Sequence, residues 1–322
     1  MKLLLVSVLI LATASTGSAD VADELAHMLS RYPDADADHD GKLTEDEAGG
    51  YFLKAFQGKR ANRGPGFRDR SLIDAYEARS YKSMPYRLMK PLRIEPADRY
   101  PLIISLHGSG GIGDDNLSNL CHWNGVMARA AWREKYSCVV VVPQRRPGGI
   151  WGPKPDDERV KDFYVRNDLL QLLELVEVLK QEFSIDEARI YVLGSSGGGV
   201  GAWNLLIARP DMFAAAITVC GHFTPKPEEL SRLTKIPIWA FHGDADPLVD
   251  VRFSRDAFAR LRDLGANVKY TELHGVKHNA WVQAFTYQGD DAQKGYVTRY
   301  SGDACDRTPD VWQWLFRQRK PE

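Results

Sequence analysis

Continuous apolar runs alternate with amphipathic stretches from about residue 72 to the end of the chain. Short apolar runs of this kind are typical of strands that are buried on both faces of a parallel sheet. The stretches between them, chiefly 169–183 and 253–264, have helical spacing, and a last helix is predicted over 310–317. The pattern predicts an α/β fold, in which a mostly parallel, twisted sheet carries helices on both faces. The predicted strands are 102–106, 138–142, 189–193, 214–219, 236–241 and 267–273.

A different pattern precedes this region. Apolar residues at helical spacing predict an amphipathic helix in a small first module, residues 20–56. Residues 57–71 are basic and glycine-rich and contain Pro65, a composition that is typical of a linker. We therefore expect the module 20–56, the linker 57–71 and then a large α/β domain over 72–322. The residues at helical spacing in the module are Val21, Leu25, Met28 and Leu29.

Residues 1–19 have the pattern of a secretory signal peptide. Lys2 precedes an apolar run over 3–11, and the small residues before Asp20 suit cleavage after Ala19. The run is too short for a stable membrane span, and an uncleaved anchor is the alternative. Since no other stretch of the sequence approaches membrane length, we expect the mature protein to be secreted or periplasmic, without membrane insertion.

Charge and composition narrow the range of partners. Lys and Arg number 42 and Asp and Glu number 43, so the formal net charge is −1 and neither nucleic acid nor an anionic membrane is predicted as a partner. Export permits disulfides, and the four cysteines allow three full pairings that the sequence does not rank. Free, buried thiols are the alternative, and no metal-ligand spacing is present among them. The cysteines are Cys121, Cys138, Cys220 and Cys305.

The stretch from Gly194 to Gly198 reads G-x-S-x-G, with Ser196 at its centre. A predicted strand over 189–193 precedes it, and a helical stretch from Val200 follows it. A serine on such a tight strand-to-helix turn has a strained backbone and holds its hydroxyl above the sheet. Ser196 is therefore the candidate nucleophile.

A serine nucleophile needs a histidine base and a carboxylate that orients the base. In this fold the acid and then the histidine follow the serine along the chain. Asp246, directly before a proline, is the preferred acid over Asp244, which is expected to brace the same loop. His278 is the preferred base over His274, and His242 is expected to support the acid loop from the core. Both loops follow predicted strands, where open α/β sheets bind ligands.

The transition state also needs donors for the developing oxyanion. One predicted donor is the backbone N–H of Gly197, directly after the nucleophile. The other is expected from the glycine-rich loop after strand 102–106, with Ser109 and Gly110 as the candidates. His107 is expected to brace this loop rather than to take part in the chemistry.

Residues 72–320 resemble single-domain α/β-hydrolases of the carboxylesterase, acyl-protein thioesterase and feruloyl-esterase-like group. The resemblance rests on the His107-Gly108 loop, the turn at 194–198, the stretch 242–247 and the late His278. In that family the acid is the aspartate before the proline, which corresponds to Asp246 here. The chain departs from the family in the long stretch between His278 and the last helix. We expect that stretch to form either a rim over the pocket or passive surface.

Residues 36–47 match the pattern of a calcium-binding EF-hand loop, which the stretch resembles. Carboxylates would come from three aspartates, a sharp turn from Gly41, and two more oxygens from a closing glutamate. Pro33 before the loop, Gly49 and Gly50 after it, and the lack of a second hand favour a stabilising or docking role over a sensor. The predicted ligands of Ca²⁺ are Asp36, Asp38, Asp40, Lys42 through its carbonyl, Thr44 and Glu47.

The leading hypothesis is thus a secreted serine hydrolase that cleaves carboxylic esters, with structural Ca²⁺ and no cofactor for catalysis. The ester is expected in a small molecule or a polysaccharide, such as acetyl or feruloyl groups, or in a polyester. One alternative is a serine peptidase of the prolyl-oligopeptidase-like type, although the first module is too small for the propeller of those enzymes. Another is a calcium-dependent binding protein on an inactive hydrolase fold. The sequence leaves the oligomeric state open.

Overall fold

The computed structural model describes residues 65–152, 166–223 and 226–320, and before them chiefly residues 32–44. The predicted signal peptide and the linker up to residue 64 lie outside the described residues. The described residues form two compact units. The first holds those up to residue 51 together with 148–152 and 166–167, and the second holds 65–147 and 168–320.

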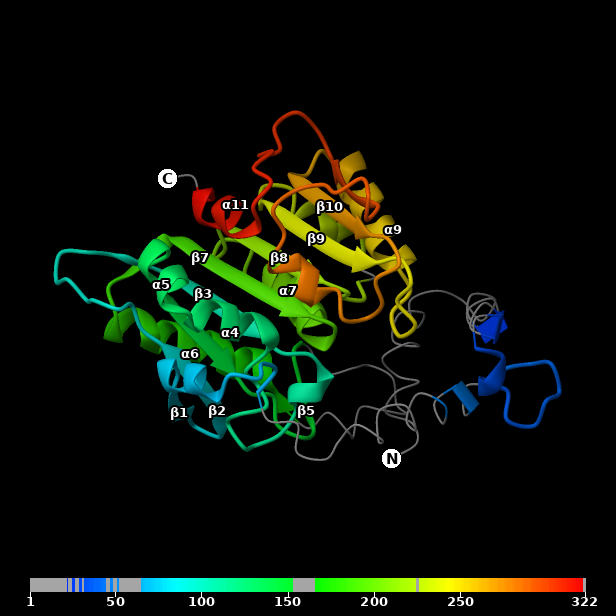
Figure 1. Ribbon diagram of the computed structural model, residues 1–322, viewed down its shortest axis with the longest axis horizontal. Helices are drawn as coiled ribbons and strands as arrows, with labels where there is room; N and C mark the ends of the chain where they lie inside the picture. Colours follow the sequence, from blue (N-terminus) through cyan, green and yellow to red (C-terminus); the bar gives the residue numbers. More distant parts are fainter. Residues whose placement is uncertain are drawn as a thin grey trace. The chain divides into compact units, whose positions relative to one another are not determined.

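A nine-stranded mixed sheet forms the centre of the second unit (Figure 1). Its strand order is β1-β2-β4-β3-β7-β8-β9-β10-β11. The run from β4 to β10 is parallel, whereas β1, β2 and β11 join antiparallel at the two edges. The strands are β1 Glu77–Tyr81, β2 Met84–Met89, β3 Tyr100–Leu106, β4 Val139–Pro143, β7 Ile185–Ser195, β8 Ala215–Val219, β9 Ile238–Gly243, β10 Val268–Leu273 and β11 Tyr296–Tyr300.

The parallel strands coincide with the apolar runs in the sequence. Every residue of β3, β4, β8 and β9 is buried, because helices cover both faces of the sheet at these strands. The predicted mostly parallel α/β sheet is therefore confirmed. Edge strand β1 alternates between half-buried and exposed positions, and the apolar-run criterion did not find it.

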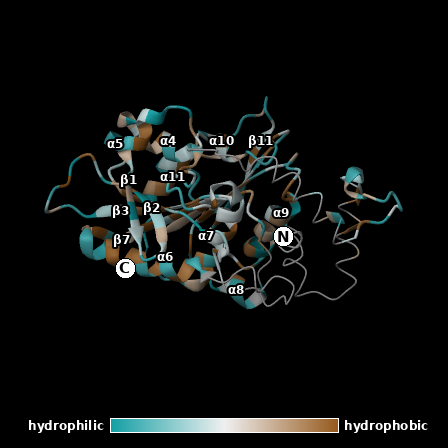
Figure 2. Ribbon diagram, turned by 90° about the horizontal axis from the view of Figure 1, so that it is seen from below, coloured by the Kyte–Doolittle hydropathy of each residue, from teal (hydrophilic) through white to brown (hydrophobic). Residues whose placement is uncertain are grey.

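Helices lie on both faces of the sheet. Figure 2 shows α4 and α5 on one side and α6 and α8 on the other. On the first side Trp132 of α5 packs edge-on against Trp312 of α11, with ring centroids 5.2 Å apart. These rings share one apolar core with Val140, Tyr191 and other residues of the strands. The helices are α4 His122–Ala128, α5 Ala130–Lys135, α6 Asp168–Glu182, α7 Gly197–Ala208, α8 Pro227–Ser231, α9 Arg252–Asp263, α10 Trp281–Ala284 and α11 Val311–Arg317, with short 3-10 turns η3 Arg70–Ala75 and η4 Ser109–Gly111.

Two segments differ from the predictions made for them. Residues 65–71, predicted as the end of a linker, belong to the second unit, where the N–H of Gly66 donates to the carbonyl of Leu120 (2.6 Å) and Phe67 packs against the core. The stretch after His278, expected as a rim or passive surface, contributes β11, which pairs with β10 and extends the sheet. Both segments are mostly polar, so their tertiary contacts are not visible in their patterns.

In the first unit, η2 Pro33–Ala35 leads into the acidic loop. Strands β5 Gly149–Ile150 and β6 Arg166–Asn167 of the same unit form a parallel pair. All four cysteines are free thiols, which is the second of the two alternatives from the sequence. Among the described residues, no helix combines the length and the apolar character that crossing a membrane requires.

Candidate active site

Ser196 lies at the sharp turn between β7 and α7. Its backbone has φ 52° and ψ −122°, a left-handed conformation that costs free energy for a residue with a side chain. The turn is held by a hydrogen bond from the Ser196 N–H to the Val219 carbonyl on the neighbouring strand (2.8 Å). A Cβ on Gly198 would collide with the Leu106 carbonyl oxygen, so glycine there lets the serine turn lie directly against the end of β3.

His278 and Asp246 meet Ser196 in a chain of hydrogen bonds. His278 Nε2 is 2.9 Å from Ser196 Oγ, and its Nδ1 is 2.7 Å from Asp246 Oδ2. Since the carboxylate can only accept, Nδ1 carries the proton and Nε2 is free to accept the serine proton. The loops after β9 and β10 supply the acid and the base, both at the carboxyl end of the parallel sheet. The structure thus brings together the three side chains that the sequence singled out.

Asp246 is buried and accepts hydrogen bonds at both oxygens. Oδ1 receives the backbone N–H groups of Leu248 (2.8 Å) and Val249 (3.0 Å). Oδ2 receives His278 and also His242 Nε2 (3.2 Å). Burial raises the pKa of Asp246, but the hydrogen bonds from His242 and His278 outweigh it and hold the pKa well below its usual range. The carboxyl group is therefore ionised despite its burial.

The alternative acid and base form a separate pair. Asp244 Oδ2 lies 2.7 Å from His274 Nδ1, and Asp244 Oδ1 accepts the N–H of Gly275 (2.6 Å). His274 is 75% exposed at its side chain, in contrast to 14% for His278. Asp244 therefore ties the acid loop to the base loop, whereas Asp246 takes the position next to the base.

The loop after β3 lies against the serine turn. A Cβ built on Gly197 would lie 3.2 Å from Ser109 Oγ and 3.5 Å from the Ser109 backbone nitrogen. Gly110, the other candidate donor, is exposed, whereas Ser109 is half-buried beside Gly197. The same Cβ would lie 4.0 Å from Nη2 of Arg145, a cation near the turn that the sequence reasoning missed. Of the two candidates for the second oxyanion donor, the geometry favours Ser109.

The buried His107 ring holds this loop in place through two hydrogen bonds. The N–H of Arg145 donates to His107 Nε2 (2.9 Å), so the ring proton is on Nδ1, which donates to the carbonyl of Gly108 (2.6 Å). Burial lowers the pKa of His107 to about 4. The ring is therefore neutral, and its two bonds link the loop to the segment after β4.

We expect this histidine to make the fold acid-sensitive. Its pKa falls from 6.5 to about 4 on folding, so the unfolded chain binds more protons in that interval. The free energy of unfolding therefore decreases as the pH falls from 6.5 to 4, by on the order of 3 kcal/mol from this residue. Denaturant unfolding at pH 7 and pH 4.5 measures the loss. The His107→Gln variant should lose less stability over this interval, and an equal loss in both proteins would contradict the assignment.

The acidic loop of the first unit gathers three carboxylates. One oxygen each of Asp36, Asp38 and Asp40 lies within 4.8 Å of the others. Asp36 is buried; its Oδ2 accepts the N–H of Gly41 (2.9 Å), whereas its Oδ1 has no hydrogen-bond partner. Gly41 has φ +81°, the left-handed turn that position six of a calcium loop requires. A buried carboxylate oxygen without a donor is the kind of group that a cation satisfies.

Glu47, which closes this loop, accepts hydrogen bonds from three other residues of it. Glu47 Oε1 accepts the N–H groups of Ala37 (2.9 Å) and Asp38 (3.3 Å), and Oε2 accepts the hydroxyl (2.6 Å) and N–H (3.0 Å) of Thr44. The bond from the Thr44 hydroxyl is the main reason that the pKa of Glu47 falls to about 2. The Lys42 N–H donates to Asp40 Oδ1 (2.7 Å). The predicted ligand residues thus lie around one loop, and they fit a hard cation.

A second group of potential metal ligands is a hydrogen-bond cluster instead. Cys220, His242 and Asp246 place one ligand atom each within 4.8 Å of the others, and all three are buried. His242 Nε2 also lies 3.0 Å from the carbonyl of Val249, which can only accept. That nitrogen must therefore carry a proton, and it has no lone pair to offer a metal.

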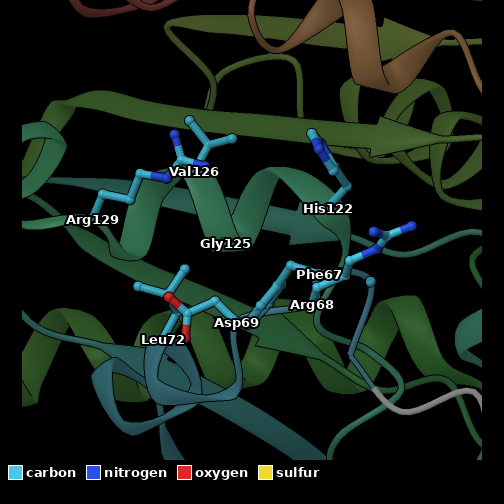
Figure 3. A pocket seen from close by; sticks show the side chains of 9 residues that line it. Phe67, Arg68, Asp69, Leu72, His122, Gly125, Val126 and Arg129 are labelled. Carbon is cyan, nitrogen blue, oxygen red and sulfur yellow. The ribbon is translucent and has the colours of Figure 1, made fainter.

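A cavity of about 400 Å³ lies between α4 and the segment that runs from Gly66 into η3 (Figure 3). The triad side chains are not among the residues that line it. Phe67, Leu72 and Val126 contribute apolar surface, and Arg68 and Arg129 contribute charge. The other lining residues are Gly66, Asp69, His122 and Gly125.

Comparisons with known proteins identify the family of the chain. The model of the phospholipase/carboxylesterase family matches residues 95–288, more than half of the chain. A solved structure titled "Crystal Structure of a Thermostable Esterase" is 30% identical, with a TM-score of 0.64 over 78% of this chain and 64% of that chain. The matched region contains the serine turn, the acid loop and the base loop.

Curated relatives give a similar picture over shorter stretches. "Putative esterase NocK" from Nocardia uniformis subsp. tsuyamanensis is 29% identical over 148 residues, 46% of this chain and 40% of that protein. Acyl-protein thioesterase 1 from Neurospora crassa is 29% identical over 130 residues, 37% of this chain and 49% of that protein. A protein named a peptidase is also similar to this chain. The chain thus covers less than half the length of either of the first two relatives.

Proposed function

The chain belongs to the phospholipase/carboxylesterase family, and from this premise we propose that it is a secreted serine esterase. The observation that carries the proposal is the 2.9 Å contact between Ser196 Oγ and His278 Nε2, with Asp246 on the other ring nitrogen. A neutral imidazole in this position can accept the serine proton as the oxygen attacks.

The proposed reaction has two halves. Ser196 Oγ attacks the ester carbonyl carbon while its proton moves to His278 Nε2, and the carbonyl oxygen becomes an oxyanion that accepts from the N–H groups of Gly197 and Ser109. Collapse of this intermediate breaks the bond to the alcohol, which leaves with the proton from His278. Water then attacks the acyl group on Ser196 by the same route, and the carboxylic acid is released. Asp246 stabilises the imidazolium in both halves.

The substrate is proposed as a carboxylic ester of a small molecule or a polysaccharide, including acetyl, feruloyl and polyester linkages. Purified protein should hydrolyse nitrophenyl acetate, feruloyl esters or acetylated xylan, and should leave proline and amino-acyl anilides intact. Preferential cleavage of the anilides would support the peptidase alternative. Absence of turnover on every ester and anilide would favour the binding protein on an inactive fold.

Secretion is the second part of the proposal, and it rests on the composition of residues 1–19. Expression of the full chain in a bacterium with a general secretory pathway tests it. The mature protein should be recovered outside the cytoplasm with an amino terminus at Asp20. Recovery from the cytoplasm with an intact first segment would contradict the proposal.

Structural Ca²⁺ in the loop 36–47 is the third part, supported by the unpartnered Oδ1 of buried Asp36. Asp36, Asp38 and Asp40 would hold the ion with the Lys42 carbonyl, Thr44 and a reoriented Glu47. The ion would neutralise the crowded carboxylates and stiffen the loop.

We expect Ca²⁺ to bind with a dissociation constant of about 10⁻⁴ to 10⁻³ M, the range of extracellular modules. Titration calorimetry measures the affinity, and the Asp36→Asn variant should lose binding. Asp34→Asn, in the exposed turn before the loop, is the matched control and should bind as the parent does. Chelation should change ester hydrolysis less than about twofold, since the ion is assigned a stabilising role. Equal affinity for Ca²⁺ in the parent and in Asp36→Asn would contradict a calcium site in this loop.

A further inference from the structure

We propose that His242 is a positioning residue of the triad, which holds the Asp246 carboxylate in place for His278. The inference rests on the proposed esterase function and adds a fourth side chain to it. His242 stands at the end of β9, four residues before the acid, and reaches the same oxygen of Asp246 that His278 contacts. Oδ2 therefore lies between two imidazole rings.

The hydrogen bonds fix the tautomer of His242. Its Nε2 faces Asp246 Oδ2 (3.2 Å) and the carbonyl of Val249 (3.0 Å), and both of these can only accept. Nε2 must therefore be protonated and donate to both. In the neutral ring Nδ1 is then an acceptor, and it receives the hydroxyl of Ser254 on α9 (2.7 Å). The chain of bonds runs from Ser254 through His242 to Asp246, and from Ser196 through His278 to the same carboxylate.

The hydrogen bond between His242 and Asp246 is shielded from solvent. His242 has no exposed surface, the side chain of Asp246 has none, and Ser254 is 7% exposed. A carboxylate in such surroundings depends on protein donors to stay ionised and in one orientation. Oδ1 is held by two backbone N–H groups, whereas Oδ2 has His278 and His242 as its donors in the hydrogen bonds described above.

Cys220, directly after β8, is a further ionisable neighbour of Asp246. Burial and the charge of Asp246 raise the pKa of its thiol well above the ordinary value, so it stays neutral. Its backbone has φ 49°, a left-handed conformation directly after the strand. The neutral thiol is itself a weak donor to the Asp246 carboxylate. His242 and His278 are the ring donors to Oδ2 beside it.

The consequence for catalysis concerns the base. When His278 gains the serine proton, the imidazolium is stabilised by a carboxylate whose position does not change. The bond from His242 fixes that position and also withdraws part of the charge. Without it, Asp246 would be freer to rotate, and more of its charge would face His278. Removal of the donor should therefore slow the reaction and favour the protonated form of the base.

The test compares His242→Leu, which removes the donor, with His242→Gln, whose amide can still donate. We expect kcat of His242→Leu to fall about 10- to 100-fold, the effect of one hydrogen bond to a charged group, with KM changed less than about threefold. The acid limb of the kcat/KM profile should move to higher pH, by about 0.5 unit or more. His242→Gln should recover kcat to within about fivefold of the parent.

His274→Leu is the matched control, because His274 forms the other histidine–aspartate pair and does not touch the triad. It should keep kcat within about twofold. If His242→Leu does not fold, Ser254→Ala carries the test. Ser254→Ala removes the donor to Nδ1 and should lower kcat about two- to fivefold. Parent kcat and an unmoved acid limb in folded His242→Leu would overturn the proposal, as would parent kcat in Ser254→Ala if His242→Leu does not fold.

Failure of the esterase proposal gives a different result. In that case the parent itself hydrolyses no ester, whereas the low-field proton resonance of the His278–Asp246 bond can still be followed by NMR. That resonance should shift in His242→Leu and stay in place in His274→Leu. An unchanged resonance in His242→Leu would contradict the positioning role whatever the substrate.

Discussion

We expect Ser196→Ala to fold as the parent does and to lose ester hydrolysis almost completely, with kcat lower by about 10⁶-fold. Alanine keeps the Cβ and therefore meets the same left-handed backbone, so the turn is not disturbed. What it removes is the oxygen that lies 2.9 Å from His278 Nε2 and forms the acyl bond. Steady-state kinetics on a nitrophenyl ester, together with a thermal unfolding curve, measure both expectations.

Ser195→Ala is the matched control for this variant. Ser195 is the last residue of β7, is buried, and has the same side chain one position away. We expect its kcat to stay within about threefold of the parent, because the hydroxyl of Ser196 is retained. Loss of activity in Ser195→Ala with retention in Ser196→Ala would move the nucleophile to the neighbouring residue.

We expect Asp246→Asn to lower kcat by about 10⁴-fold while KM changes little. The substitution keeps the shape of the side chain but removes the charge that stabilises the imidazolium. An amide also cannot accept from His278, His242 and two backbone N–H groups as the carboxylate does. The base is then free to take the wrong tautomer, with its proton toward the serine.

Asp244→Asn, in the same loop, is the comparison that makes this result specific. It weakens the bonds to His274 and to the N–H of Gly275, and so loosens the link between the two loops. We expect a loss of less than about tenfold in kcat. A larger loss of kcat in Asp244→Asn than in Asp246→Asn would contradict Asp246 as the acid and identify Asp244 instead.

The parallel strands were predictable because burial on both faces leaves only apolar residues in them. The run 102–106 lies within β3, and 138–142 corresponds to β4 with a shift of one residue at each end. Edge strands lack that signature. In β11 two of the five positions are exposed, so its partnership with β10 is determined by tertiary contacts rather than by its own pattern.

The serine turn was predictable from the G-x-S-x-G spacing together with the apolar strand before it, the helical stretch after it and the candidate acid and base downstream. The sequence also favoured Asp246 over Asp244, for the proline that follows it, and His278 over His274, but all four lie in loops after predicted strands and spacing alone does not pair them. The distances separate them into two pairs, His278 with Asp246 and His274 with Asp244. The bond between His242 and Ser254 spans two elements of the fold and has no local signal in the sequence.

The family and the fold are settled by the match over residues 95–288, together with the sheet. The calcium loop and the secretion signal remain proposals that rest on the spacing of ligands and on composition. A calcium loop can be predicted from sequence because its ligands lie within one short segment, so their positions along the chain determine which of them meet in space. A triad assembled from three distant segments depends on the fold.

Mass measurement of the intact protein after reaction with a fluorophosphonate shows whether Ser196 is the nucleophile. We expect one phosphonyl group on the parent, located by peptide mapping to Ser196, an unchanged degree of labelling in Ser195→Ala, and none in Ser196→Ala. Labelling that persists in Ser196→Ala would rule out Ser196 as the nucleophile, as would ester hydrolysis by a parent that takes up no label.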